Sequence, residues 1–323
     1  EEGSERRDRF QPRSEMRFFE VVPESQRPRT EMRTEMQPVT PIADTRAGFS
    51  LIHPGTVEDP LRIVLIMPRS PFQKEKPTRL PLGVMSLASC LRDKGYMTKV
   101  ALNSGEMPAT KIPSIQVTIL DLQAEEDDFD LAARLKEIDP DMVGVSAVTP
   151  FIQEAVKIAG TAQAVVPKAV RVLGGAHVSA LEKDDQTGLK QLLDESSFHM
   201  AVLGQGEQVF PEAVLRLSNG MTFDTLAGVA YKHDLKQNEP VTVHRRSGPK
   251  SERIGFEDYP LPSASLDLVK QSGYARMINI EGKDVGIAGV IMTSLSCPFN
   301  CTFCASKAIF DSLFVFSSSR INV

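Results

Sequence analysis

Three cysteines near the end of the chain, Cys297, Cys301 and Cys304, have the spacing of ligands for one inorganic cluster. They lie in the order C-x3-C-x2-C, so a single tight loop can bring the three thiolates together. Cysteine thiolates are the usual protein ligands of iron–sulfur clusters. Three of them on a four-iron cubane leave one iron without a protein ligand, where a small molecule can bind. The motif therefore predicts a 4Fe–4S site with one open iron.

A structural zinc ion is the main alternative for these cysteines. Such a site usually has four ligands, often as paired C-x2-C units. The chain has one further cysteine, Cys90, which falls on the apolar face of a predicted helix, and no histidine follows Cys304. Disulfides are disfavoured, because four cysteines in 323 residues without a secretory signal are not the framework of a secreted protein. Iron–sulfur ligation is the better interpretation, with zinc or a chance spacing as the alternative.

The overall composition is that of a globular protein. Hydrophobic residues make up 41% and charged residues 24% of the chain, close to globular averages. The net charge of −5 gives no basic footprint for nucleic acid. No apolar run approaches the roughly 20 residues of a membrane span. We therefore expect a cytoplasmic protein with a small-molecule substrate, no nucleic-acid partner and no membrane span.

Residues 1–57 differ from the rest of the chain. They contain nine arginines, no lysine and ten acidic residues, together with several prolines and few apolar residues. Segments of this composition cannot bury enough apolar surface to fold. We expect a disordered extension here.

Strands and helices alternate from about residue 60 onward. Short continuous apolar runs predict buried parallel strands, and apolar residues at i, i+3, i+4 and i+7 predict the helices between them. This alternation is typical of a doubly wound, Rossmann-like α/β sheet. The predicted strands are Arg62–Met67, Ile115–Leu120, Met142–Ala147, Val170–Leu173 and Met200–Leu203, and the predicted helices run from Leu82 to Gly95 and through the stripes Leu131–Ile138, Ile152–Ala159 and Val209–Leu217.

Small and polar residues follow four of these strands. Ligands of doubly wound sheets bind beyond the carboxyl ends of the strands, where glycines admit a large ligand and hydroxyls bond to its polar edges. Each such residue is also an ordinary turn residue, so a purely structural role is the alternative for any one loop. The candidates lie in Leu80-Pro81-Leu82-Gly83, in Ser146-Ala147-Val148-Thr149, in Gly174-Gly175-Ala176-His177 and in Gly204-Gln205-Gly206-Glu207.

The order of these loops before the C-x3-C-x2-C motif resembles the family of cobalamin (B12)-binding-domain radical S-adenosylmethionine (SAM) enzymes. The resemblance covers roughly residues 60–310, and the aromatic Phe303 before the last cysteine also matches it. It implies a 4Fe–4S cluster on the three cysteines, with SAM on the open iron and near Phe303. It also implies cobalamin contacts from one set of loop residues: Leu82, Gly83, Ser146, Thr149, Gly174, Gly175, His177, Gly204, Gly206 and Glu207. The chain contains no Asp-x-His-x-x-Gly motif, so His177 is not expected to ligate cobalt.

The resemblance further implies a reaction. In this family the reduced cluster cleaves SAM to a 5′-deoxyadenosyl radical, with a flavodoxin or ferredoxin as reductant, and methyl transfer to an unactivated carbon is the commonest outcome. Three alternatives stay open. They are a radical SAM cyclase or rearrangement enzyme, a radical SAM protein whose Rossmann-like domain no longer holds cobalamin, and a non-catalytic cobalamin-binding module.

The segments after the sheet predict the remaining organisation. Gly228–Tyr231 and Val241–His244 read as a β-hairpin, and residues 248–270 as an extended linker. Gly289–Thr293 reads as the first strand of a radical SAM β/α barrel, and Ala305–Phe310 as the start of its first helix. Because barrels take on the order of 200 residues, we expect only the truncated start of one. The expected domains are 1–57, a disordered extension; 58–222, a cobalamin-binding Rossmann-like domain; 223–285, a hairpin and linker; and 286–323, the incomplete radical SAM domain.

Overall fold

A computed structural model describes the chain from Ile52 onward, with gaps. The described residues are 52–73, 75–105, 112–183, 186–232, 241–244, 256–274, 278–280, 282–286, 294–295, 299, 301, 304 and 315–316. Most of the predicted disordered extension lies outside them. Its last residues, 52–57, belong to the fold: Ile52 is buried in the core and the Gly55 carbonyl accepts a hydrogen bond from the amide of Ser114.

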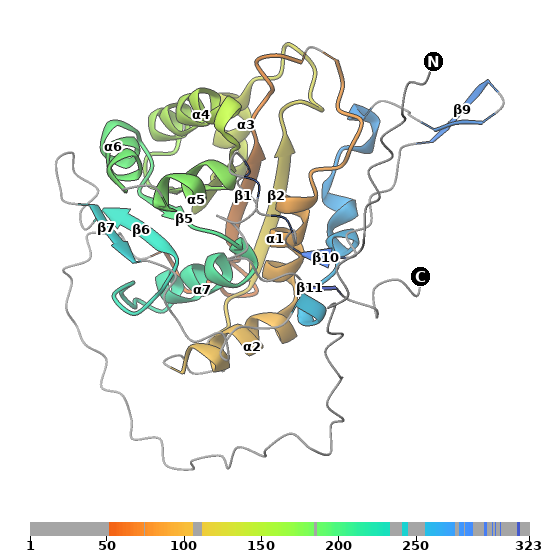
Figure 1. The fold of residues 1–323 in the computed structure, drawn as a ribbon. Coiled ribbons are helices and arrows are strands. Elements are labelled where there is room, and N and C mark those ends of the chain that lie inside the picture. The colour runs from red at the N-terminus through yellow and green to blue at the C-terminus, as the bar shows by residue number, and fades with distance from the viewer. Residues whose placement is uncertain are drawn as a thin grey trace, which may run out of the picture. The chain divides into compact units, whose positions relative to one another are not determined.

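Seven strands form one sheet in the order β2-β1-β3-β4-β5-β6-β7 (Figure 1). The first five are parallel, and β6 and β7 continue the sheet antiparallel to β5. The order 2-1-3-4-5 is that of flavodoxin-like doubly wound folds, so the predicted fold class is confirmed. The bounds are β1 Leu61–Met67, β2 Ile115–Asp121, β3 Met142–Ser146, β4 Val170–Gly174, β5 Met200–Val202, β6 Val229–Lys232 and β7 Val241–His244.

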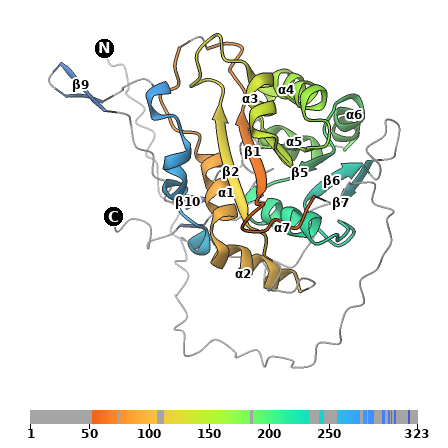
Figure 2. The same ribbon diagram turned by 180° about the vertical axis from the view of Figure 1, so that it is seen from behind.

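Helices cover both faces of the sheet (Figures 1 and 2). One face packs against α1 (Leu82–Arg92), α2 (Lys94–Ser104) and α7 (Gly206–Ser218). The other packs against a second group of four: α3 (Leu131–Ile138), α4 (Ile152–Val165), α5 (Ala176–Lys183) and α6 (Thr187–Glu195). Strand β1, with the sequence LRIVLIM, is buried on both sides, which explains why its apolar run is nearly continuous.

The predicted helix from Leu82 to Gly95 is in fact two helices. The first ends at Arg92, and Asp93 then caps α2 by accepting a hydrogen bond from the amide of Tyr96 at 2.9 Å. Gly95 is therefore the second residue of a new helix rather than the end of the old one. An aspartate N-cap explains the new start, because its carboxylate satisfies an amide that the first turn leaves unbonded.

The segment after the sheet also differs from the prediction. Residues 256–274, expected in part as an extended linker, form three short 3₁₀ turns: η4 (Phe256–Asp258), η5 (Pro262–Leu268) and η6 (Gln271–Gly273). They lie beside α1 in both ribbon views (Figures 1 and 2). We call residues 256–274 the return segment. Proline at the start of η5 fits the fixed backbone of a first turn and explains why an extended reading failed.

Two small antiparallel pairs complete the described chain. Strand β8 (Ile278–Ile280) pairs with β9 (Lys283–Gly286), and β10 (Ser294–Leu295) pairs with β11 (Val315–Phe316). The predicted strand Gly289–Thr293 and helix start Ala305–Phe310 lie outside the described residues. Among the helices that are described, none has the length and apolar character needed to cross a membrane.

Candidate functional site

A cavity of about 160 Å³ opens at the carboxyl ends of the parallel strands. Leu65 of β1, Gly144 of β3 and Phe210 of α7 form part of its wall, together with residues of α1. Seven of the predicted site residues also line it: Gly83, Ser146, Gly174, Gly175, Gly204, Gly206 and Glu207. We call it the glycine-lined cavity. The topology brings these loops together because all four preceding strands point to the same edge of the sheet.

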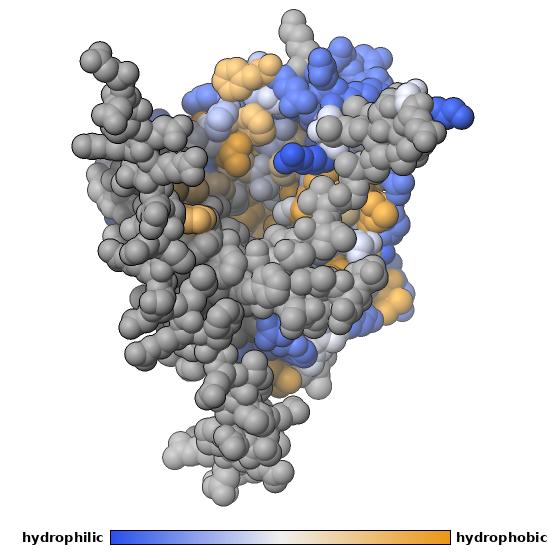
Figure 3. Space-filling view, turned by 45° about the vertical axis from the view of Figure 1, so that its right-hand side comes forward, coloured by the Kyte–Doolittle hydropathy of each residue, from blue (hydrophilic) through white to orange (hydrophobic). Residues whose placement is uncertain are grey.

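The walls are apolar between these loops. Leu65, Val172 and Val202 contribute from the strands, and Val84 and Leu87 from α1. In the space-filling view, hydrophobic side chains gather in a hollow in the upper part of the molecule, the end towards which β1 and β2 point (Figure 3). An apolar cleft with a few polar groups is the usual form of a small-molecule site.

Glycine provides the space in this cavity in two ways. At Gly83 and Gly174, an added Cβ atom would meet nothing within 4 Å, so the space in front of them is open. At Gly144 and Gly206, an added Cβ would lie 3.0 Å from Leu65 and 3.1 Å from Leu87, so a side chain would push on the cavity wall. Gly144 was not among the predicted site residues, although a glycine between two valines of a buried strand can indicate a close approach.

Three polar residues line the cavity: Ser146, Gln205 and Glu207. The hydroxyl of Ser146 has no hydrogen-bond partner within the described part of the chain. Glu207 lies in the first turn of α7, and its carboxylate accepts a hydrogen bond from Ser86. Burial raises the pKa of the Glu207 carboxyl above its usual range, and the bonds from its own amide and from Ser86 oppose that shift. Tyr96 donates to the Glu207 backbone carbonyl at 3.0 Å and so fixes the start of the helix.

Leu82, Thr149 and His177 are the three predicted cavity residues that do not line it. His177 lies in the first turn of α5, where its Nδ1 is 3.1 Å from the Thr149 hydroxyl. Partial burial lowers the pKa of the imidazole, so it is neutral at physiological pH. The pair joins the loops after β3 and β4.

The cysteine motif is described only in part. Cys301 and Cys304 are exposed, and the Cys304 amide donates to the Cys301 carbonyl at 3.2 Å, which is the hydrogen bond of a tight turn. Cys297 and Phe303 lie outside the described residues. Within the described ranges, no three His, Cys, Asp or Glu side chains are grouped as metal ligands. Cys90 is buried in α1, as the sequence predicted.

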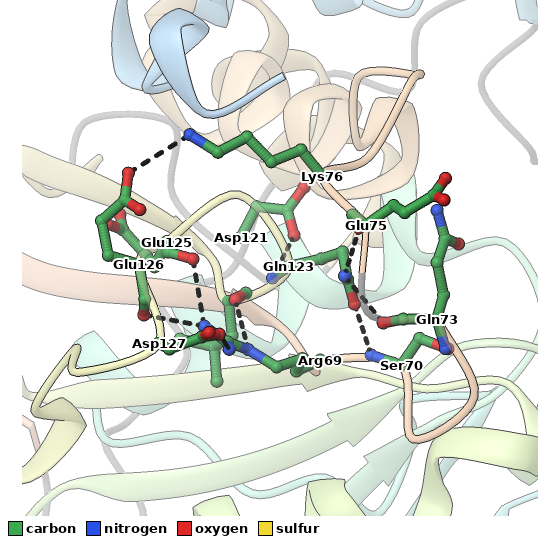
Figure 4. A network of polar contacts seen from close by, with 11 residues as sticks. Arg69, Ser70, Gln73, Glu75, Lys76, Asp121, Gln123, Glu125, Glu126 and Asp127 are labelled. Atoms are coloured by element: carbon green, nitrogen blue, oxygen red, sulfur yellow. Dashed lines mark hydrogen bonds and ion pairs between the residues drawn. The ribbon is translucent and has the colours of Figure 1, made fainter. Parts of the chain in front are cut away.

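A hydrogen-bonded platform is formed by the loops that follow β1 and β2 (Figure 4). The Gln123 side chain accepts from the Ser70 amide at 2.7 Å and donates to the carbonyls of Gln73 and Glu75. Arg69 donates to the carbonyls of residues 122, 125 and 126 and pairs with Asp127 at 2.6 Å. The loops that follow β1 and β2 are therefore joined into one body.

Residues 78–214 match the family model of the B12-binding domain. The chain is 30% identical over 256 residues to an uncharacterized methyltransferase of Pyrococcus horikoshii, and the match covers 77% of this chain and 46% of that protein. It is 26% identical to the cytidylyl-2-hydroxyethylphosphonate methyltransferase of Streptomyces wedmorensis, covering 70% of this chain and 44% of that protein. The chain thus spans less than half the length of these two curated relatives.

A solved structure shares the fold. It is the cobalamin-dependent S-adenosylmethionine radical enzyme OxsB with aqua-cobalamin and S-adenosylmethionine bound. The TM-score is 0.51 at 16% sequence identity, and the match covers 76% of this chain and 28% of that one.

Fold and cavity together define a doubly wound α/β protein with an apolar cavity at the carboxyl edge of its sheet. The family match falls on the segment that builds this site, from the loop before α1 to the middle of α7. Residues 78–214 of the chain thus belong to the B12-binding domain family.

Proposed function

We propose that this chain binds cobalamin in the glycine-lined cavity as part of a radical SAM methyltransferase. The observation that carries the proposal is the convergence of loops from four parallel strands on one cavity, within the segment that matches the B12-binding domain. The methyltransferases of Pyrococcus horikoshii and Streptomyces wedmorensis support the reaction class.

The residues present fit cobalamin. Open space in front of Gly83 and Gly174 forms a cradle that any larger side chain would fill. An engineered cavity of roughly 150 Å³ holds one aromatic ring, so the observed volume of about 160 Å³ would take part of a larger ligand that extends out of the opening. Ser146 and Glu207 supply the polar contacts, and the strands and α1 supply the aliphatic wall.

The remaining predicted residues take supporting roles in this proposal. Leu82 stands at the start of α1, next to Gly83. Thr149 and His177 hold the rim through their hydrogen bond. His177 is not assigned as a cobalt ligand, because it does not lie in an Asp-x-His-x-x-Gly motif.

The cysteine motif supplies the second half of the site in this proposal. Cys297, Cys301 and Cys304 would hold a 4Fe–4S cluster, with Phe303 against SAM. When bound, these groups supply cleavage of SAM to a 5′-deoxyadenosyl radical and methyl transfer to an unactivated carbon, with electrons from a flavodoxin or ferredoxin. The chain's own part is to hold both groups, because cofactors carry such chemistry and the protein positions them.

Cyclisation is the second candidate reaction. The chain is 38% identical over 85 residues to the anaerobic magnesium-protoporphyrin IX monomethyl ester cyclase of Cereibacter sphaeroides. That match covers 26% of this chain, against 77% for the Pyrococcus horikoshii methyltransferase, so methyl transfer is favoured.

Cobalamin titration tests the first half of the proposal. Hydroxocobalamin added to the chain should give a saturable change in its visible spectrum. Gly174→Leu should abolish the change by filling the cavity, because nothing else stands in front of that residue. The matched control is Gly160→Leu in α4, where an added Cβ also meets nothing within 4 Å but no cavity is present. Equal binding by the two variants would contradict the assigned site.

Iron analysis tests the second half. Anaerobic reconstitution should give about four irons per chain. Alanine at Cys297, Cys301 and Cys304 together should abolish iron binding, whereas Cys90→Ala should retain it because Cys90 is fully buried in α1. Full iron content in the triple variant would contradict the assignment of these cysteines as cluster ligands.

A further inference from the structure

The return segment crosses α1 through contacts between residues far apart in the chain. The hydroxyls of Ser89 and Ser265 hydrogen-bond at 2.8 Å, both side chains are buried, and 176 residues separate them. Arg92 pairs with Asp267 through two bonds of 2.7 and 3.0 Å. The return segment is therefore an integral part of the fold rather than a tether.

The segment ends at the carboxyl edge of the sheet. The Tyr274 hydroxyl donates to the Asp121 carboxylate at 2.6 Å, and Asp121 is the last residue of β2. The Gln123 amide donates to the other oxygen of that carboxylate at 3.1 Å. Since Gln123 also holds the loop after β1, Asp121 connects the end of the return segment to the platform in Figure 4.

Close packing reinforces this contact. A Cβ atom added to Gly273 would lie 2.7 Å from the Ala124 Cβ and closer still to the Ala124 carbonyl oxygen. Tyr274 itself is only 4% exposed. Here the backbone of the return segment lies directly against the loop after β2.

Exposure decides which contacts fix the segment. The side chains of Arg92 and Asp267 are 37% and 59% exposed, and exposed ion pairs contribute little to stability. Lys270 pairs with Glu125 at 2.6 Å but is itself 44% exposed. The partly buried bond between Tyr274 and Asp121 is therefore the stronger restraint on the end of the segment.

From these contacts we propose that Asp121 and Tyr274 are positioning residues. Their hydrogen bond fixes the end of the return segment at the end of β2. From there the chain continues to the cysteine motif, so the bond would fix the start of that path relative to the loops of the glycine-lined cavity. The inference rests on the proposed function, because such a restraint matters only if the two sites cooperate. Reacting groups must be held closely, and a displacement of about 1 Å can cost on the order of a hundredfold in rate.

Hydrogen–deuterium exchange of the full chain tests the restraint without any cofactor. Tyr274→Phe removes one hydroxyl and should speed the exchange of amides in residues 270–286 about tenfold, as expected for loss of a hydrogen bond to a charged group. Asp121→Ala should act alike. Asp121→Asn keeps one acceptor oxygen but is neutral and replaces the other oxygen with a donor, so its exchange should lie between wild type and Asp121→Ala. Arg92→Ala, which breaks the exposed pair on the same segment, is the control and should stay within about twofold of wild type.

A spectroscopic measurement tests positioning itself. In the protein loaded with cob(II)alamin and reduced cluster, magnetic coupling between the two centres broadens the electron paramagnetic resonance signal of the cluster. Wild type and the control Arg92→Ala should show the same broadening, whereas Tyr274→Phe should show a wider spread of distances between the two centres. Unchanged exchange or an unchanged spectrum in Tyr274→Phe would overturn the proposal. If the wild-type chain did not bind hydroxocobalamin, the proposed function would be overturned instead. The exchange measurement needs no cobalamin, so the two failures can be told apart.

Discussion

Gly175 lies so close to Ala147 that a Cβ atom on Gly175 would stand 2.8 Å from the Ala147 backbone nitrogen and closer still to its carbonyl oxygen. Gly175 also has a φ of +100°, which side chains rarely adopt. The glycine therefore keeps the loops after β3 and β4 together. The sequence predicted a ligand contact at Gly175. The structure shows in addition that the fold itself needs a glycine there.

Gly175→Ala should lower the free energy of unfolding by about 2 kcal/mol or more, because strain and steric overlap add. Gly174→Ala is the matched control: its Cβ meets nothing within 4 Å, so its stability should stay within about 0.5 kcal/mol of wild type. Urea denaturation of the two variants measures both effects. Equal stabilities would show that the loop can relax around a methyl group.

His199 should make the fold sensitive to acid. It is buried at 3% exposure, and burial, then the charges of Arg171 and Lys232, lower the pKa of the imidazole to about 3. Between the ordinary histidine pKa of about 6.5 and this value, the unfolded chain binds more protons, so stability falls as pH falls. The expected slope is up to about 1.4 kcal/mol per pH unit.

His199→Asn should remove this part of the pH dependence. Its carbonyl oxygen can replace Nδ1 as the acceptor for the Arg171 amide, a bond of 3.0 Å. Urea denaturation from pH 7 down to pH 4 compares the two proteins. Parallel curves would mean that another group carries the acid sensitivity.

Glu207 should act in the opposite direction. Its carboxyl pKa is raised, chiefly by burial, so the folded chain holds the proton more tightly and the stability contributed by the group is lost as pH rises through the folded-state pKa. Glu207→Gln stays neutral at every pH and should therefore be more stable than wild type at pH 8. At pH 4 the two proteins should be nearly equal. A variant less stable than wild type at pH 8 would show that the ionised carboxylate is needed there.

The boundary of the ligand-binding domain can be tested with fragments. Residues 58–222 contain the predicted domain but end before β6, whose Val229, Ala230 and Tyr231 are at most 1% exposed. We expect a fragment of 52–274 to melt cooperatively and to bind hydroxocobalamin. The 58–222 fragment should melt at a lower temperature or aggregate, because β5 then becomes an open edge. Equal melting temperatures would show that β6 and the return segment are dispensable.

The sequence predicted the parallel strands and the ligand edge because both leave local signals. Buried strands such as Arg62–Met67 must be apolar on both faces, and the loops that follow them need glycine. Helix α2 was missed because Gly95 reads as a helix end, whereas the deciding contact is the cap from Asp93. Helices α5 and α6, of eight and nine residues, were also missed.

Long-range contacts left no such signal. No periodic pattern in the sequence predicts that Ser265 contacts Ser89, or that Tyr274 donates a hydrogen bond to Asp121. The composition of the return segment, with Pro260 and Pro262, is that of a linker, and its packing depends on surfaces built elsewhere in the chain. The same holds for Gln123 in the platform, whose side chain hydrogen-bonds to three backbone groups of the loop after β1.

The return segment also sets an order of events during synthesis. It packs on α1, which leaves the ribosome long before it, and the chain must be made as far as Tyr274 before that surface is covered. Until then the buried hydroxyl of Ser89 and the apolar residues around it face solvent. Contacts of such high sequence separation form slowly. The nascent chain therefore passes through a stage in which α1 is open to chaperones and to aggregation.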